Sequence, residues 1–105
     1  MPAQASLLDS ARGKNYDAIN KVITDKQGDE ATEEIERWAS RVTSSADPKA
    51  QTSVYYDADS STYVIRVARG MRILLFRLSE AQVRTPEREA ECEKTLRRKI
   101  KDLSL

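Results

Sequence analysis

The sequence predicts an α+β protein with the element order α-α-β-β-β-α and a three-stranded antiparallel sheet. Two observations carry this prediction. Three short runs of β-branched, aromatic and aliphatic residues lie between residues 53 and 78 and are separated by turn residues. On either side of them, apolar residues recur at helical spacing. At 105 residues, with 39 % hydrophobic and 33 % charged residues, the chain has the size and composition of one domain.

The chain is predicted to begin with two helices, over residues 5–25 and about 30–45. The second has the clearer pattern, a stripe of four apolar residues at helical spacing: Ala31, Ile35, Trp38 and Val42. Asp29 is placed to cap this helix, and the run Ala46-Asp47-Pro48 ends it. Trp38 is expected to anchor the core.

These boundaries divide the chain into two parts. Residues 1–28 are expected to form an N-terminal helical extension, and residues 29–105 an α-β-β-β-α domain that binds RNA or a partner. We expect the helices to pack on one face of the sheet. The alternative is that the N-terminal helix covers the other face.

The pairing of the strands follows from a two-residue turn. The strands are expected over residues 53–56, 63–68 and 73–78, and Gly70-Met71 lies between the last two. Glycine supplies the positive φ that a tight type II′ hairpin needs at its first turn position. The predicted partners, all on one core face, are then Val67 with Leu74, Ile65 with Phe76, Tyr63 with Leu78, Tyr56 with Tyr63 and Val54 with Ile65.

The opposite side of the sheet, which we call the outer face, has an unusual composition. It comprises seven residues: Tyr55, Val64, Arg66, Ala68, Ile73, Leu75 and Arg77. The set is too apolar for a face that only meets solvent and too basic for a core. Three interpretations stay open: the N-terminal helix covers it, a protein partner binds it, or it binds RNA.

The last element is predicted to be a helix that starts at Thr85-Pro86, with proline at its tolerated first position, after a capped turn at residues 79–82. Its apolar stripe is read as Ala90, Leu96, Ile100 and Leu103, with Cys92 close to it and partly buried. The cations near its end, at residues 97–99 and 101, suit the negative end of the helix dipole.

Missing residue types narrow the chemistry. The chain has no histidine and a single cysteine, which removes imidazole catalysis, makes a transition-metal site improbable and excludes an internal disulfide. We expect a non-enzymatic protein without cofactors, in a reducing compartment such as the cytoplasm. No apolar run approaches the roughly 20 residues of a membrane span. Residues 1–61 hold seven Lys/Arg against eleven Asp/Glu, net −4, and residues 62–105 hold eleven against six, net +5.

From Ile35 onward the chain resembles the smaller of the two Alu-domain proteins of the signal recognition particle. The resemblance rests on Ala46-Asp47-Pro48 at a helix end, on Tyr55-Tyr56 at a strand end, and on the strands at residues 63–67 and 73–77. Members of that family tend to carry a basic residue within the middle strand and another after the aromatic of the third. Arg66 and Arg77 match those positions.

The resemblance implies a cytoplasmic ribonucleoprotein subunit. In that family the α-β-β-β-α chain forms a heterodimer with a related second Alu-domain protein, and the joined sheets bind Alu-type structured RNA during cotranslational targeting. Together with the strand register, it implies an RNA-binding set on and beside the outer face: Arg66, Arg77, Arg69, Arg72 and Tyr55. Arg69 and Arg72 flank the tight turn and are expected to extend one basic stripe.

Other functions remain as alternatives. A small protein-interaction or regulatory module would use the same sheet face. A small ribonuclease of the bacterial toxin type would open with a strand, which this chain lacks. A double-stranded-RNA-binding domain shares the α-β-β-β-α order but carries a lysine cluster where this chain has residues 85–89, Thr-Pro-Glu-Arg-Glu.

Overall fold

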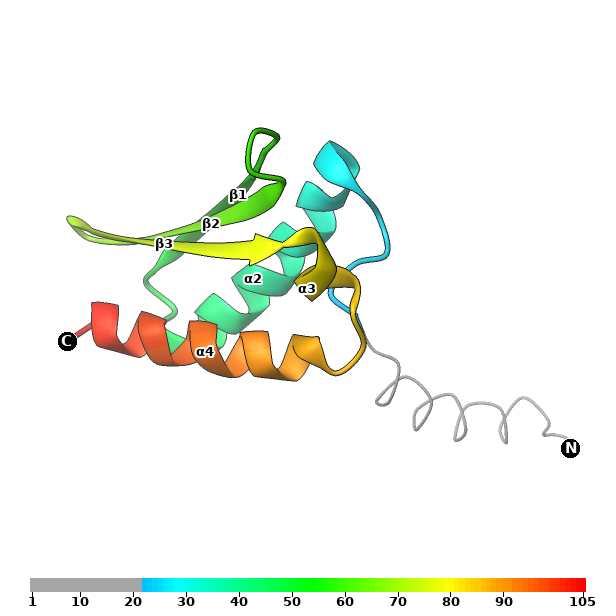
Figure 1. Cartoon of the computed structure of the whole chain (residues 1–105). Coiled ribbons are helices and arrows are strands. Elements are labelled where there is room, and N and C mark those ends of the chain that lie inside the picture. The colour runs from blue at the N-terminus through cyan, green and yellow to red at the C-terminus, as the bar shows by residue number, and fades with distance from the viewer. Residues whose placement is uncertain (1–21) are drawn as a thin grey trace, which may run out of the picture.

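The structure, a computed structural model, describes residues 22–105, in which a three-stranded antiparallel sheet has its helices on one face (Figure 1). This confirms the predicted α+β class. The elements are η1 (Gly28–Ala31, a 3₁₀ turn), α2 (Thr32–Ala46), β1 (Gln51–Asp57), β2 (Thr62–Arg69), β3 (Arg72–Ser79), α3 (Glu80–Arg84) and α4 (Arg88–Leu103). The strands lie in the order β1-β2-β3, so β2 is central and both other strands are edges.

Residues 22–27, just before η1, contact the rest of the described chain. The predicted helix over residues 5–25 lies largely outside the described residues, and its last part, residues 22–25, is not helical, so the prediction is wrong there. The backbone amides of Ile23 and Thr24 donate to the carbonyl of Val83 at 3.0 and 3.2 Å, and Ile23 is buried in the core. A hydrogen bond from the Thr24 hydroxyl to Glu34, at 2.6 Å, ties the segment to α2.

Helix α2 buries the predicted stripe. Ala31, Ile35, Trp38 and Val42 are all buried, which confirms Trp38 as a core residue. The helix begins differently from the prediction: Asp29 does not cap it through its side chain, because the chain first forms the turn η1. The Thr32 hydroxyl instead donates to the Asp29 carbonyl at 2.8 Å. As predicted, the helix ends before Pro48; its C-cap Asp47 is extended, the conformation favoured before proline.

The strand register agrees with the prediction. Val67 pairs with Leu74, Ile65 with Phe76, and Tyr63 with Leu78, while Tyr56 and Val54 of β1 pair with Tyr63 and Ile65. Gly70 has a φ of 63°, and Arg69 pairs with Arg72, so the β2–β3 loop has two residues. The three central residues of the inner face, Tyr63, Ile65 and Val67, are fully buried against the helices.

The connection into α4 corrects the prediction for the last helix. Ser79 caps α3 in a reciprocal capping box with Gln82, as the capped turn predicted. Thr85 is then extended, because it precedes Pro86, and this ends α3. Glu87 has a φ of 78°, and α4 begins only at Arg88, so Pro86 lies outside the helix.

The buried stripe of α4 agrees with the prediction at Leu96 and Ile100, which are fully buried, and Leu103 packs partly buried against the core, but the stripe differs at Ala90. Ala90 is exposed, while the buried residues are Glu89, Cys92, Leu96 and Ile100. These four follow one another at spacings of three or four residues and so share a face. Ala90 belongs to the predicted stripe because it is apolar, but its position along the helix places it on the exposed side.

Helices α2 and α4 lie side by side and run in the same direction. Three hydrogen bonds between the helices show this: Trp38 with Glu89, Ser45 with Arg97 at 2.6 Å, and Asp47 with Ser104. Residues later in α2 contact residues later in α4, as parallel helices require. An odd number of antiparallel strands between two helices on one face produces this parallel arrangement. The core is the space that these helices and the inner face of the sheet enclose.

A polar network links the sheet to α3. Glu80 accepts hydrogen bonds from the hydroxyls of Tyr56 and Tyr63, at 2.9 and 3.1 Å, and forms an ion pair with Arg84. The two tyrosine rings lie 4.9 Å apart. Burial, and then the Glu80 carboxylate, raise the pKa of Tyr63 to about 12. The network satisfies polar groups that α3 brings against the sheet.

Candidate interaction face of the sheet

The outer face lies on the side of the sheet away from α2 and α4 (Figure 1). Tyr55, Ile73 and Leu75 on this face are exposed to 51 %, 53 % and 55 %. They occupy both edge strands, and the central strand between them carries Val64 and Arg66. Three large apolar or aromatic side chains at half exposure are unusual for a surface that meets only water.

Arg66 is the central cation of this face. It lies in β2 between Ser53 of β1 and Leu75 of β3, and it is exposed. Its side chain has no hydrogen bond or ion pair with any residue in the range 22–105. Val64, two residues before it, is fully buried although it is on the outer face, because Tyr55 and Arg77 flank it on the adjacent strands. The outer face therefore has a packed end at Val64 and an open end at Arg66.

Arg77 lies at the packed end and is engaged within the chain. Its Nη1 is 3.4 Å from Asp57 Oδ2 and donates to Thr62 Oγ1 at 3.1 Å. Hydrogen bonding from Ser60, and after it from Arg77, lowers the pKa of Asp57 despite partial burial. The Arg77 side chain is 52 % exposed. Asp57 therefore neutralises part of the charge of Arg77, while the guanidinium is still accessible to solvent. Sequence reasoning missed Asp57, although alternation from Tyr55 places it on the same face.

Arg69 turns to the opposite side of the sheet. Its Nε donates to Asp47 Oδ2 at 2.8 Å, and Asp47 also accepts hydrogen bonds from the Ser104 hydroxyl and from the Lys49 amide. Asp47 is only 7 % exposed. These bonds, Ser104 first, lower the pKa of Asp47. Arg69 thus joins the end of β2 to the ends of α2 and α4.

Arg72 also reaches the helix layer. Its Nη1 donates to the carbonyl oxygens of Leu103 and Leu105, at 2.9 and 2.6 Å. A cation at the carbonyl end of α4 is favoured by the helix dipole. Arg72 therefore contributes to holding the β2–β3 turn against the end of α4.

The five residues expected to bind RNA are thus divided between two sides of the sheet. Tyr55, Arg66 and Arg77 share the outer face, while Arg69 and Arg72 bond toward the helices. Strand alternation could have shown this, because Arg69 has the same parity as buried Val67. The basic stripe expected to run through all four arginines does not form.

Chemically, the outer face can bind but offers little for catalysis. It presents apolar side chains, the Tyr55 hydroxyl and the Arg66 guanidinium, which has no partner in the described part of the chain. Within residues 22–105, no three or more His, Cys, Asp or Glu side chains gather as a metal site. None of the described helices combines the length and the apolar character needed to cross a membrane.

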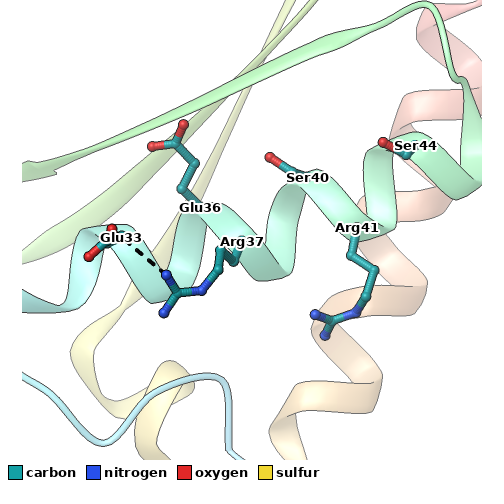
Figure 2. Close-up of a pocket in the computed structure, with 6 residues that line it drawn as sticks. All are labelled: Glu33, Glu36, Arg37, Ser40, Arg41 and Ser44. Atoms are coloured by element: carbon teal, nitrogen blue, oxygen red, sulfur yellow. Dashed lines mark ion pairs between the residues drawn. The ribbon is translucent and has the colours of Figure 1, made fainter.

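A second surface feature is a hollow on the exposed side of α2, shown in Figure 2. It is lined by Glu33, Glu36, Arg37, Ser40, Arg41 and Ser44 and measures about 660 Å³. In Figure 2, Arg37 and Arg41 point to one side of α2, and Ser40 and Ser44 to the other. Because all of the lining residues belong to one helix, they would contact a ligand on one side only, whereas ligand sites usually enclose most of the ligand surface.

Comparison of the chain with models of protein families, with curated proteins and with solved structures finds no match.

Proposed function

We propose that this chain is a non-enzymatic binding subunit and that a protein partner binds its outer face. The observation that carries the proposal is the half exposure of Tyr55, Ile73 and Leu75 on a face that no helix of the described residues covers. Exposed apolar side chains that neighbour one another, as Ile73 and Leu75 do on β3, are typical of protein interaction sites, and Tyr55 adds an aromatic ring across the same face. The free guanidinium of Arg66 beside them favours a partner that carries a carboxylate at the matching position.

The outer face has few cations available to bind RNA, and this favours a protein partner over RNA. Affinity for a phosphate backbone depends on how many phosphates are neutralised. Of the four arginines first expected to act together, Arg69 and Arg72 bond toward the helices and Arg77 is paired with Asp57. Of these four arginines, only Arg66 is left without a partner among the described residues.

Structured RNA is the second candidate, and a specific arrangement favours it. Arg66 and the exposed ring of Tyr55 lie on the same face, where a guanidinium can reach a phosphate and a tyrosine ring can stack on a base. A second, related Alu-domain-like subunit would then cover Ile73 and Leu75 and add cations of its own. Under this proposal the chain works as a heterodimer in the cytoplasm, a location that also suits its single free cysteine.

Three variants distinguish the two candidates. The double variant I73S/L75S removes apolar surface, R66A removes the free cation, and the control M71A changes a side chain that is fully exposed in the turn. The tagged full chain and each variant are isolated from cells that express them, and the retained proteins and RNA are quantified. The association state of each purified chain is measured by light scattering.

A protein partner predicts one particular pattern. A specific protein is retained by the wild type and by M71A but lost from I73S/L75S. RNA that is retained by the wild type, lost from R66A and released by salt would favour the second candidate. Self-association that only I73S/L75S abolishes would identify the partner as a second copy. Retention that none of the substitutions changes would contradict a role for the outer face.

A further inference from the structure

Helix α4 carries a second exposed surface, on the opposite layer of the molecule from the outer face. Lys94, Arg98 and Lys101 are exposed and follow one another at spacings of four and three residues, so they share one side of the helix. The buried residues Leu96 and Ile100 point to the other side, into the core. We call these three cations the α4 stripe. It extends over about 10 Å of helix at 1.5 Å per residue.

The cations of the α4 stripe differ from Arg88 and Arg97 of the same helix in having no partner among the described residues. Lys99 also lacks one there, but it lies on another side of the helix. Arg88 pairs with Glu91 at 3.4 Å, and Arg97 pairs with Glu93 at 2.6 Å. None of the three stripe side chains forms a hydrogen bond or an ion pair within residues 22–105. Over residues 94–105 the sequence has five Lys or Arg and one carboxylate, Asp102. Asp102 follows Arg98 at a spacing of four residues, but it forms no ion pair with the stripe, whose net charge stays positive.

The helix dipole explains only part of this charge. Cations are stabilised by the dipole within the last turn of a helix, and of the stripe only Lys101 lies there. Lys94 and Arg98 lie further from the end of α4 at Leu103. The helix dipole therefore does not explain why Lys94 and Arg98 lie on the same side of α4 as Lys101.

We propose that the α4 stripe binds the phosphate backbone of a nucleic-acid duplex. A duplex carries one phosphate charge per about 1.7 Å of its axis, counted over both strands, so a stripe about 10 Å long can face several phosphates. Lysine and arginine side chains contact such phosphates without reading the base sequence. The inference does not depend on the proposed role of the outer face, because the two surfaces lie on opposite layers and can be occupied together (Figure 1).

An anionic membrane is disfavoured as the ligand. Helices that bind membranes in the interface plane insert an apolar side among the lipids. The apolar residues of α4, Leu96 and Ile100, are fully buried against the sheet and α2, so they are not available for insertion. Leu105, just beyond the end of α4, is exposed, but a single leucine does not give the helix an apolar side. A row of cations of this kind fits a hydrophilic polyanion.

The test is a titration of the full chain with short fluorescent duplexes of DNA and of RNA, at several salt concentrations. The variant K94Q/R98Q/K101Q neutralises the stripe with residues that favour helix formation. The matched control, R37Q/R41Q/K49Q, removes the same charge from exposed positions on α2 and just after it. R66A is included to detect binding by the outer face. Circular dichroism and the urea midpoint establish that each variant is folded.

The proposal predicts that the wild type binds duplex, and that K94Q/R98Q/K101Q loses at least about tenfold in affinity with a salt slope smaller by about 3, about 1 per cation. The control triple and R66A should bind as the wild type does. A preference for the DNA or the RNA duplex identifies the nucleic acid.

Three results would overturn the proposal. The first is equal binding by the wild type and the stripe variant, or no binding by either. The second is an equal loss in the control triple, which would make net charge the cause. The third is binding to phosphatidylserine vesicles without binding to either duplex. Failure of the stripe would leave the outer-face experiment unaffected, since that experiment depends on I73S/L75S and R66A.

Discussion

The indole Nε1 of Trp38 donates a hydrogen bond to Glu89 Oε2 at 2.9 Å, and both residues are buried between α2 and α4. The bond joins residues 51 positions apart and aligns the two parallel helices. It also explains how a glutamate can occupy the buried stripe of α4, because a buried polar group is stable when it has hydrogen-bond partners.

This bond predicts different effects of two substitutions at Glu89. E89A leaves the Trp38 N–H buried without its acceptor, which should lower the free energy of unfolding by about 1–3 kcal/mol. E89Q keeps an oxygen acceptor and should lose clearly less. Urea denaturation followed by tryptophan fluorescence measures both, because Trp38 is the only tryptophan. Equal losses for the two variants would show that the acceptor oxygen is not what matters.

The Glu80 network predicts a dependence of stability on pH. Hydrogen bonds from Arg84, and then from Tyr56 and Tyr63, lower the pKa of Glu80 in the folded chain against the opposing effect of burial. A lowered pKa stabilises the fold above the ordinary value of 4.5, and this contribution is lost as the pH falls through the folded value.

The wild type should therefore be more stable than E80Q at neutral pH, and the difference should shrink below about pH 4.5. Urea unfolding at a series of pH values measures it. E36Q, at an exposed position on α2, serves as the control. A difference between the wild type and E80Q that stays constant down to the acid limit would contradict the lowered pKa.

The positive φ of Gly70 predicts a cost for alanine at that position. No atom lies within 4 Å of an added Cβ, so G70A meets no steric contact and its cost comes from the backbone conformation alone. We expect a loss of about 1–2 kcal/mol in the free energy of unfolding. M71A, at the next turn position, should change stability little because Met71 is fully exposed. Thermal or urea unfolding compares them.

The arginines on the two sides of the sheet should differ in their effect on stability. R69A removes the ion pair that connects β2 to Asp47, so its urea midpoint should fall. R66A removes a side chain without a partner among residues 22–105, so its midpoint should stay at the wild-type value. If the two substitutions were equally harmless, the Arg69–Asp47 pair would have no structural role.

Cys92 should be unreactive in the folded chain. Burial, and after it the charge of Glu91, raise the pKa of the thiol, so the reactive thiolate is scarce, and the side chain is only 6 % exposed. A thiol reagent should modify it slowly in buffer and rapidly in urea. The variant M71C/C92A places a cysteine at a fully exposed position and should react rapidly in both. Rapid modification of native wild type would show that the α4 side of the core opens readily.

Local rules were enough to predict the sheet and the buried side of α2. A two-residue turn at Gly70-Met71 and the period of two along a strand determine which residues pair and which share a face. The stripe from Ala31 to Val42 likewise follows from helical periodicity alone. These features depend on neighbours that are close in sequence or are joined by a short turn.

Only the tertiary structure decided which polar side chains are already engaged. Arg69 with Asp47, Arg77 with Asp57 and Trp38 with Glu89 are pairs between residues 20 to 51 positions apart. The tertiary structure likewise places Ile23, which is buried and whose backbone amide donates to the carbonyl of Val83, 60 residues further along the chain. Several Asp and Glu residues could pair with a given arginine, and no short-range sequence pattern shows which of them lies close to it in the fold. The packing of α2, α4 and the sheet makes that choice, and among the described residues it leaves Arg66 and the α4 stripe exposed to solvent without a partner.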